Sequence, residues 1–478
     1  MPGFGSRIGA TLHLPAQRGK RIVVVVAVLV LAAVVGTGVG LGAPVLVRQL
    51  ATASTVAAIA ASPAPVIPHP ALRPAAVDGP APTSSGVRAA LDPLVAAGGL
   101  GRLSGQVIDP VTGTVLWQRE PGTPLVPGST AKLLTSAAAL LALDHEAGLK
   151  TTVLAGSEPG TVVLVGGGDP TLSAAKPGTV TVYPGAARLD DLVAQVRAAA
   201  PGPVRRVLVD VHRYTGDAMA PGWLPADVAG GYIAPIVPVM LDGAREDPTQ
   251  EVSPRAAKPA TAAAAELARR LGADPDTVAV GTAAPGAAVL GEVSSPPVQD
   301  LVATVLSTSD NVLAESLARE VARTTGAQPS FSGATQAVLT VLRAHGFDVS
   351  GVTLMDGSGL SVQDAVPATL LASLLSVAAA PDESQRRTAA LRPMLVGLPV
   401  AGSSGTLADR YDGPAGGGRG WVRAKTGTLT GVNSLAGTVL DADGRVLVFA
   451  LLSNGPNPVS VRPRLDVLAT QLQSCGCR

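Results

Sequence analysis

Three short motifs along the chain carry side chains that could attack and process a carbonyl group. They are S-x-x-K at residues 129–132, S-D-N at 309–311 and K-T-G at 425–427. A serine hydroxyl is a weak nucleophile at neutral pH, and a partly buried lysine whose pKa is lowered can serve as the base that it needs. The first motif therefore predicts that Ser129 is a nucleophile and that Lys132 activates it.

The local context of the first motif supports this prediction. Pro127 and Gly128 interrupt the preceding segment, and a helix is expected from Ser129 to about residue 143. Ser129 and Lys132 then lie one turn apart on the same face. The start of a helix also presents backbone N–H groups where an oxyanion would form. The alternative interpretation is an N-cap serine followed by a solvated lysine.

A second S-x-x-K sequence, at residues 173–176, provides an internal comparison. Pro177 and Gly178 follow it directly, so no helix can continue to hold Ser173 and Lys176 on one face. We therefore expect Ser129, and not Ser173, to be the nucleophile.

The second motif lies between two helical runs and supplies further polar groups. Ser309 is expected to relay a proton toward the leaving group. The Asn311 amide is expected to bind a peptide oxygen of the substrate and to orient Lys132. The alternative is a helix-capping turn, since Ser and Asp are good N-caps.

The third motif lies in a predicted strand whose edge a peptide could line. Lys425 is expected to hold a negatively charged terminus, and Gly427 to let the substrate approach the backbone. The N–H groups of Ser129 and Thr428 are expected to form an oxyanion hole. The alternative for Lys425 is an ordinary lysine on a strand surface. The predicted catalytic residues are thus Ser129, Lys132, Ser309 and Lys425, and the predicted substrate-binding residues of these motifs are Asn311, Thr426, Gly427 and Thr428.

The residue types in these motifs are scarce, so their joint occurrence is informative. The chain has six lysines and four asparagines, and its one S-x-N sequence lies between the two motif lysines. The five histidines do not fall at metal-ligand spacing, so we expect no metal and no cofactor, and a Ser-His-Asp triad has little material. A net charge of +1 gives no electrostatic footprint for nucleic acid.

The organisation of the N-terminal part predicts export. Residues 1–21 are basic, and residues 22–47 are almost wholly apolar and long enough to cross a membrane. We expect a single-pass anchor in the cell membrane with most of the chain outside the cytoplasm. A cleaved signal peptide is the alternative and would make the protein secreted. Residues 48–87 are rich in Ala and Pro and are expected to be a linker.

The remaining chain is expected to fold as a multi-domain α/β (α+β) protein. Residues 88–150 and 291–478 are expected to form one domain, which ends with a strand, a hairpin turning at Asp443-Gly444, and a helix. Between these two parts, residues 151–290 alternate short β-like runs with Ala-rich helices. This alternation predicts an inserted α/β region.

The three motifs in this order resemble the signature of penicillin-binding proteins and serine β-lactamases. The long spacing between the first two resembles that of the class C low-molecular-mass penicillin-binding proteins, the S13 family of D-alanyl-D-alanine carboxypeptidases/endopeptidases. The resemblance spans roughly residues 88–470. Further runs similar to that family are GGGDPTL at 166–172, DGSGLS at 356–361, AG at 401–402 with GTL at 405–407, and VRAKTGTL at 422–429.

The resemblance implies a transpeptidase-like domain with helices on an antiparallel five-stranded sheet. It also implies attack of Ser129 on the D-Ala-D-Ala end of peptidoglycan stem peptides, hydrolysis of the acyl-enzyme, companion endopeptidase activity and inhibition by β-lactams. In this family the insertion contributes to a pocket for the third stem residue, and Trp223, Asp227 and Tyr232 look similar, with Leu429 and Thr430 nearby. An ordinary turn is the alternative for the first three. Val362 stands where the family usually has a basic residue.

The same residues are compatible with two alternative functions. A β-lactamase would use the same nucleophile, but the chain shows no glutamate in an E-x-x-x-N setting and has a large insertion. A catalytically slow penicillin-binding scaffold of the cell wall would keep the motifs and dock partners through the insertion. Release of D-Ala from a stem peptide distinguishes the carboxypeptidase from both.

Overall fold

The computed structural model describes residues 79–200, 202–455 and 458–476, which lie in one unit of the chain. The predicted basic N-terminus, the predicted anchor at 22–47 and most of the predicted linker lie outside the described residues. Within the described part, no helix is both long and apolar enough to cross a membrane.

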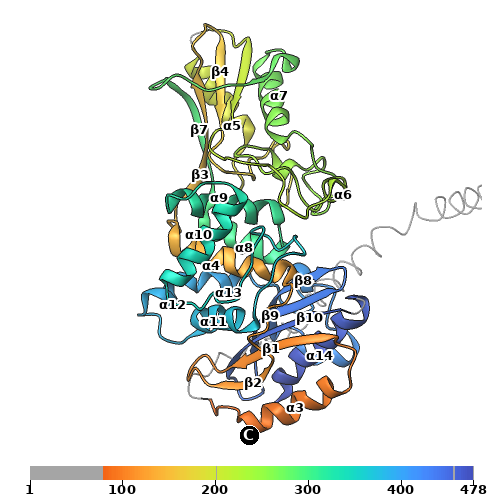
Figure 1. Cartoon of the computed structure of the whole chain (residues 1–478). Coiled ribbons are helices and arrows are strands. Elements are labelled where there is room, and N and C mark those ends of the chain that lie inside the picture. The colour runs from red at the N-terminus through yellow and green to blue at the C-terminus, as the bar shows by residue number, and fades with distance from the viewer. Residues whose placement is uncertain (1–78, 201, 456–457, 477–478) are drawn as a thin grey trace, which may run out of the picture. The chain divides into compact units, whose positions relative to one another are not determined.

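Five strands of the described chain form an antiparallel sheet in the order β2-β1-β10-β9-β8 (Figure 1). Their bounds are β1 Arg102–Ile108, β2 Val115–Arg119, β8 Val422–Leu429, β9 Val432–Leu440 and β10 Val446–Asn454. Between β9 and β10 the chain turns at Gly444, which has a φ of 84° and donates its N–H to the Asp441 carbonyl. The predicted antiparallel five-stranded sheet is confirmed, and it leaves β8 at one edge.

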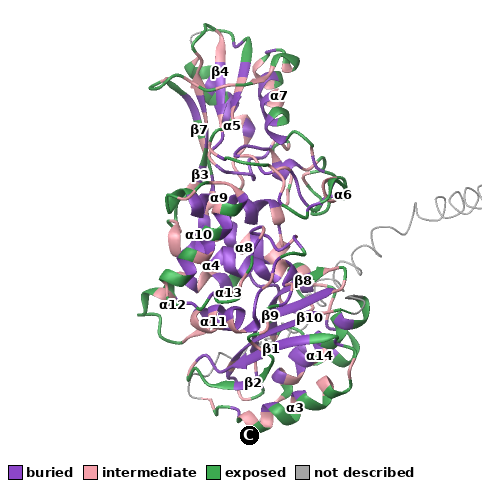
Figure 2. Cartoon of the chain, viewed as in Figure 1, coloured by how far each residue is buried: buried purple, intermediate pink, exposed green. Residues whose placement is uncertain are grey.

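Alternation along the central strand β10 explains why helices cover both faces of this sheet. Phe449 and Leu451 are buried with α3 (Ser84–Ala96) and α14 (Pro458–Ser474). Val448 and Ala450 are buried with the helices of the opposite layer. Figure 2 shows β1, β9 and β10 as mostly buried. The opposite layer consists of α4 Lys132–Ala142, α8 Val298–Thr308, α9 Asn311–Thr324, α10 Phe331–Ala344, α11 Ala368–Ala379, α12 Arg386–Leu391 and α13 Pro393–Gly397.

A second sheet, in the order β6-β5-β4-β3-β7, is built from the chain between α4 and α8. Its strands are β3 Gly148–Ala155, β4 Thr161–Val165, β5 Arg206–Asp210, β6 Ala279–Val280 and β7 Val289–Pro297. The pairs β4-β5 and β5-β6 are parallel and the other pairs are antiparallel. With α5 (Leu189–Ala199) and α7 (Pro259–Leu271), this sheet buries a hydrophobic core of its own.

The loops between β5 and α7 form a smaller cluster that packs on α9 and α10. This cluster includes the short helix α6 (Pro225–Ala229) and buries Trp223 and Ile233 against Val312 and Phe331. Because Val312 directly follows the second motif, this packing brings part of the inserted chain to the three motifs.

Candidate active site

Ser129 and Lys132 lie at the junction of a 3-10 turn, η1 (Gly128–Ala131), and helix α4. The helix predicted to open at Ser129 therefore begins as a 3-10 turn and becomes α-helical at Lys132. Lys132 Nζ lies 3.0 Å from Ser129 Oγ, as a nucleophile and its base require. Ser129 is half-buried, whereas Lys132 is fully buried. Ser129, the predicted nucleophile, is thus partly open to solvent, and Lys132, its predicted base, lies on the buried side.

The Lys132 amine contacts the other motif segments as well. It lies 2.5 Å from Asn311 Oδ1 and 2.6 Å from the Ser358 carbonyl oxygen, and it donates hydrogen bonds to both in its charged form. Burial lowers the pKa of Lys132 from 10.5 to about 8, and the nearby Asp356 carboxylate is the largest influence that opposes this shift. A lysine with this pKa is partly neutral at physiological pH and can accept a proton.

The second motif lies between α8 and α9, as predicted, and both the functional and the capping interpretation hold for it. Ser309 ends α8 in the left-handed region, with a φ of 62°. Asp310 caps α9 by accepting a hydrogen bond from the Leu313 N–H at 2.8 Å. Asn311 begins α9, and its amide nitrogen donates to the Tyr232 carbonyl at 2.8 Å. One turn therefore aims Ser309 and Asn311 at the site while Asp310 anchors it.

Asp310 is a site-supporting residue that the sequence analysis did not assign. Its carboxylate accepts hydrogen bonds from Arg245 and from the Tyr183 hydroxyl, each at 2.8 Å. Although burial acts to raise it, Arg245 and Arg255 hold the pKa of Asp310 below its usual range. An ionised Asp310 thus ties the second motif to the inserted chain.

The third motif lies on the edge strand β8, where Lys425 reaches the second motif. Lys425 Nζ donates to Ser309 Oγ at 2.8 Å and to the Thr426 carbonyl at 2.9 Å. Lys425 is fully buried, and burial together with the nearby Lys132 holds its pKa well below the usual value. The Thr426 hydroxyl pairs with that of Thr406 at 2.9 Å. Lys425 is therefore not a lysine of the strand surface, which was the alternative; it contacts Ser309 from the buried side, and its role in holding a substrate terminus stays a prediction.

Glycines allow β8 to come close to the nucleophile. A Cβ added to Gly427 would lie 3.0 Å from the Ser129 nitrogen and 2.2 Å from Ser434 Oγ. A Cβ added to Gly128 would lie 3.2 Å from the Thr428 nitrogen. The backbone N–H groups predicted to form the oxyanion hole therefore belong to adjoining segments.

A cleft of about 480 Å³ opens beside Ser129. Of the predicted residues, its walls include Ser129, Asp227, Ser309, Asn311, Thr428, Leu429 and Thr430. The predicted residues Lys132 and Lys425 are buried behind this wall, and Thr426 and Gly427 belong to the strand beside it. The structure thus brings all the predicted site residues to one place.

The second S-x-x-K sequence is arranged differently. Ser173 is buried and its hydroxyl accepts a hydrogen bond from the Ala175 N–H, whereas Lys176 is exposed. A buried serine beside a solvated lysine lacks the contact that Ser129 and Lys132 make.

The comparisons with known proteins agree with this geometry. The model of the D-Ala-D-Ala carboxypeptidase 3 (S13) family matches residues 87–251 and 244–472. Carboxypeptidase DacB of Mycolicibacterium smegmatis is 47% identical over 424 residues, which cover 88% of this chain and 91% of that protein. This chain belongs to the S13 family. It is a D-alanyl-D-alanine carboxypeptidase and a penicillin-binding protein of the low-molecular-mass class.

Two further proteins similar to this S13 enzyme have lower sequence identity to it. The D-alanyl-D-alanine carboxypeptidase of Actinomadura sp. is 28% identical over 462 residues, covering 78% of this chain and 81% of that protein. The crystal structure of penicillin-binding protein 4 from Haemophilus influenzae matches with a TM-score of 0.62 at 21% identity. That match covers 80% of this chain and 97% of the other, and it shows a shared fold.

The inserted chain of this S13 enzyme supplies cleft residues that the sequence analysis missed. Arg245, Glu251, Val252 and Arg255 line the cleft. Arg255 is buried and donates to the Gly231 carbonyl at 3.0 Å, which positions the backbone next to Tyr232. No motif marks these residues, and their place follows from the packing of loops far from the nucleophile in sequence.

Asp227 and Trp223 differ in where they lie. Asp227 lines the cleft, and its carboxylate also caps α6 by accepting the Leu224 N–H at 2.7 Å. Trp223 was considered for the same pocket, but it is buried behind it and stacks edge-on against Phe331. Val362 is 57% exposed and is not among the residues that line the cleft.

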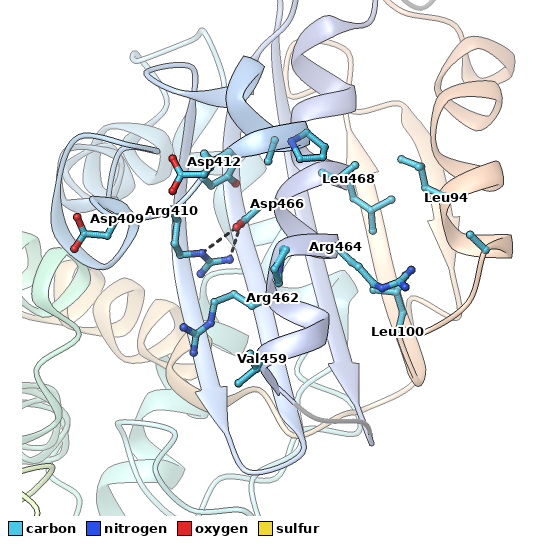
Figure 3. Close-up of a pocket in the computed structure, with 16 residues that line it drawn as sticks. Leu94, Leu100, Asp409, Arg410, Asp412, Val459, Arg462, Arg464, Asp466 and Leu468 are labelled. Atoms are coloured by element: carbon cyan, nitrogen blue, oxygen red, sulfur yellow. Dashed lines mark hydrogen bonds and ion pairs between the residues drawn. The ribbon is translucent and has the colours of Figure 1, made fainter.

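A second cavity, of about 570 Å³, lies between α3, α14 and the loop 409–415 (Figure 3). An ion pair between Arg410 and Asp466 crosses part of it. None of its lining residues belongs to the three motifs.

Proposed function

We propose that Ser129 attacks the carbonyl carbon of the terminal D-Ala-D-Ala bond while neutral Lys132 takes the hydroxyl proton. The contact of 3.0 Å between the Nζ atom of the fully buried Lys132 and Ser129 Oγ carries this assignment. Partial neutrality follows from burial, which lowers the pKa of Lys132 to about 8. Attack gives a tetrahedral intermediate whose oxyanion faces the N–H groups of Ser129 and Thr428.

Collapse of this intermediate breaks the C–N bond and needs a proton for the leaving D-Ala nitrogen. Ser309 supplies it from the cleft wall and takes up in exchange the proton that Lys132 removed from Ser129, so Lys132 is neutral again; Lys425 holds the Ser309 hydroxyl in place. The product is an ester between Ser129 and the shortened stem peptide. Water then attacks the ester with Lys132 as base, which releases the peptide and restores the Ser129 hydroxyl.

The stem peptide is proposed to lie along the free edge of β8. Asn311 holds a peptide oxygen, and Asp227, Leu429 and Thr430 face the side chain of the third stem residue. A cross-linked peptide differs in its leaving amine only, so DD-endopeptidase activity is proposed as a companion reaction. β-Lactams are proposed to acylate Ser129. For the neighbouring Haemophilus influenzae protein, a crystal structure in complex with a β-lactam is known.

We further propose that residues 22–47 anchor the enzyme in the cell membrane with its catalytic part outside the cytoplasm. The length and apolarity of this segment and its basic flank support the proposal. Peptidoglycan stem peptides are outside the cytoplasm, so this topology would give the enzyme access to its substrate.

Incubation with a fluorescent penicillin and with a D-Ala-D-Ala stem peptide tests the assignment of the nucleophile. Wild type and Ser173→Ala should bind the label covalently and release D-Ala. Ser129→Ala should do neither. Labelling of Ser129→Ala would overturn the assignment. Rapid release of hydrolysed penicillin without D-Ala release would instead indicate a β-lactamase.

A further inference from the structure

The indole of Trp223 contacts the loop that also contacts Lys132. Trp223 belongs to the inserted chain, is 7% exposed, and stacks edge-on against Phe331 at 5.1 Å between ring centroids. Its Nε1–H donates to Asp356 Oδ2 at 2.7 Å. Asp356 is fully buried and begins the DGSGLS run at 356–361. The hydrogen bond therefore joins two segments that are 133 residues apart in sequence.

The Asp356 carboxylate organises the loop that carries this run. Besides the Trp223 indole, it accepts the backbone N–H groups of Ser358, Gly359 and Ser361, at 3.0, 2.6 and 2.7 Å. These four hydrogen bonds fix the carboxylate relative to the loop backbone. The indole is the one of these four groups that comes from outside the loop.

The same loop holds the catalytic lysine. Its Ser358 carbonyl lies 2.6 Å from Lys132 Nζ, and its Gly357 carbonyl accepts the Thr135 hydroxyl of α4 at 2.6 Å. Gly359 has a φ of 78°, and a Cβ there would lie 2.0 Å from the Gly128 carbonyl oxygen. The position of this loop thus determines where one hydrogen-bond acceptor of Lys132 lies.

Several titratable or charged side chains surround Lys132 and Asp356. Burial, assisted by Asp356, raises the pKa of Glu315 to about 8 and that of Asp364 to about 9, so both hold protons at neutral pH. Of these acids, Asp356 has the largest electrostatic effect on Lys132. The groups that act on this cluster are Asp310, Glu315 and Arg319 from the second motif and α9, Asp356 and Asp364 from the loop, and Lys425 from β8.

We propose that Trp223 is a positioning residue for catalysis, whose indole N–H holds the Asp356 carboxylate and thereby the loop whose Ser358 carbonyl contacts Lys132. The inserted chain then contributes to the reaction from behind the site, in addition to its contribution to the cleft. This inference rests on the proposed role of Lys132 as the base.

The pH dependence of acylation by a fluorescent penicillin, measured on the full chain, tests the inference. Trp223→Phe keeps the aromatic ring against Phe331 but removes the N–H donor. Without it, the loop can shift, and a Ser358 carbonyl that moves away from Lys132 Nζ stabilises the charged amine less, which favours the neutral form of Lys132. The rise in rate should move to lower pH by about 0.5–1 unit, and the plateau rate should fall about tenfold because the loop shifts.

Trp117→Phe is the matched control. Trp117 is also buried, and its indole donates to the Asp92 carboxylate at 2.9 Å on a part of the first sheet that does not line the cleft. This variant should lose stability but keep the wild-type pH profile. A Trp223→Phe profile that is unchanged, or a Trp117→Phe profile that shifts equally, would overturn the inference.

Asp356→Asn removes the carboxylate that the Trp223 indole contacts and leaves the inserted chain unchanged. This variant tests the inference if Trp223→Phe does not fold. Its profile should shift to lower pH by at least as much, and adding Trp223→Phe should shift it no further. Additive shifts would overturn the coupling. Lys132→Ala separates the two hypotheses: wild-type acylation by that variant contradicts the base assignment, whereas loss of acylation beside an unshifted Trp223→Phe profile contradicts only the inference about Trp223.

Discussion

Lys132 is the residue at which burial and hydrogen bonding act on one reactive nitrogen. Only its neutral form can take the proton of Ser129, and burial lowers its pKa to about 8. The acylation rate should therefore rise about tenfold per pH unit below this value and level off above it. Stopped-flow acylation between pH 5.5 and 9.5 measures this profile. A midpoint near the ordinary lysine value of 10.5 would contradict the assignment.

Lys132→Arg provides the control for this profile. A guanidinium stays charged in the whole range, so the variant should lose about 10²–10⁴ in acylation rate and show no rise near pH 8.

Gly427 has no side chain, which lets β8 lie close to the Ser129 nitrogen of the proposed oxyanion hole. In Gly427→Ala the added Cβ would press on the Ser129 nitrogen and on Ser434 Oγ. Displacing one oxyanion donor should lower the acylation rate by about 10²–10³. Gly122→Ala, where a Cβ would meet nothing within 4 Å, should acylate like wild type. Equal rates for the two variants would mean that β8 does not form the hole.

At the scale of elements, the junction of α8 and α9 depends on Asp310. Asp310→Ala removes the cap of α9 and leaves Arg245, whose side chain is 3% exposed, without its ion-pair partner. Loss of a buried partner should cost about 3–5 kcal/mol of unfolding free energy, measured by urea titration. Asp412→Ala breaks the pair with Arg419, where the carboxylate side chain is 82% exposed, and should cost under about 1 kcal/mol. Similar losses would rule out the proposed anchoring.

At the scale of the whole molecule, the proposed anchor at residues 22–47 predicts that the enzyme acts at the membrane. The full chain should sediment with membranes, resist extraction by high salt and dissolve in detergent, because about 20 apolar residues suffice to span a bilayer. Its N-terminal peptide should be present in the mature protein. Release by salt, or a mature chain that begins after residue 47, would support the cleaved signal peptide instead.

Much of the site could be predicted because the chemistry imposes local patterns. A nucleophile and its base one turn apart give S-x-x-K, and a scarce residue type such as lysine makes each occurrence informative. The hairpin at Asp443-Gly444 could also be predicted, since turn residues act over a few positions, whereas the five-stranded antiparallel sheet was implied by the family resemblance. Ser309 shows the limit, because its left-handed backbone is imposed by the two helices that it joins, and a serine gives no sign of it.

The sequence by itself therefore determined the three motifs and the family resemblance. It also predicted that the K-T-G motif lies in a strand along which a peptide could bind. Only the tertiary structure decided that Lys425 contacts Ser309 from the buried side, that Arg245 holds Asp310, and that the Trp223 indole bonds to Asp356. The physical reason is separation along the chain: these contacts join residues 65 to 133 positions apart, and burial and packing, which carry no local pattern, select them.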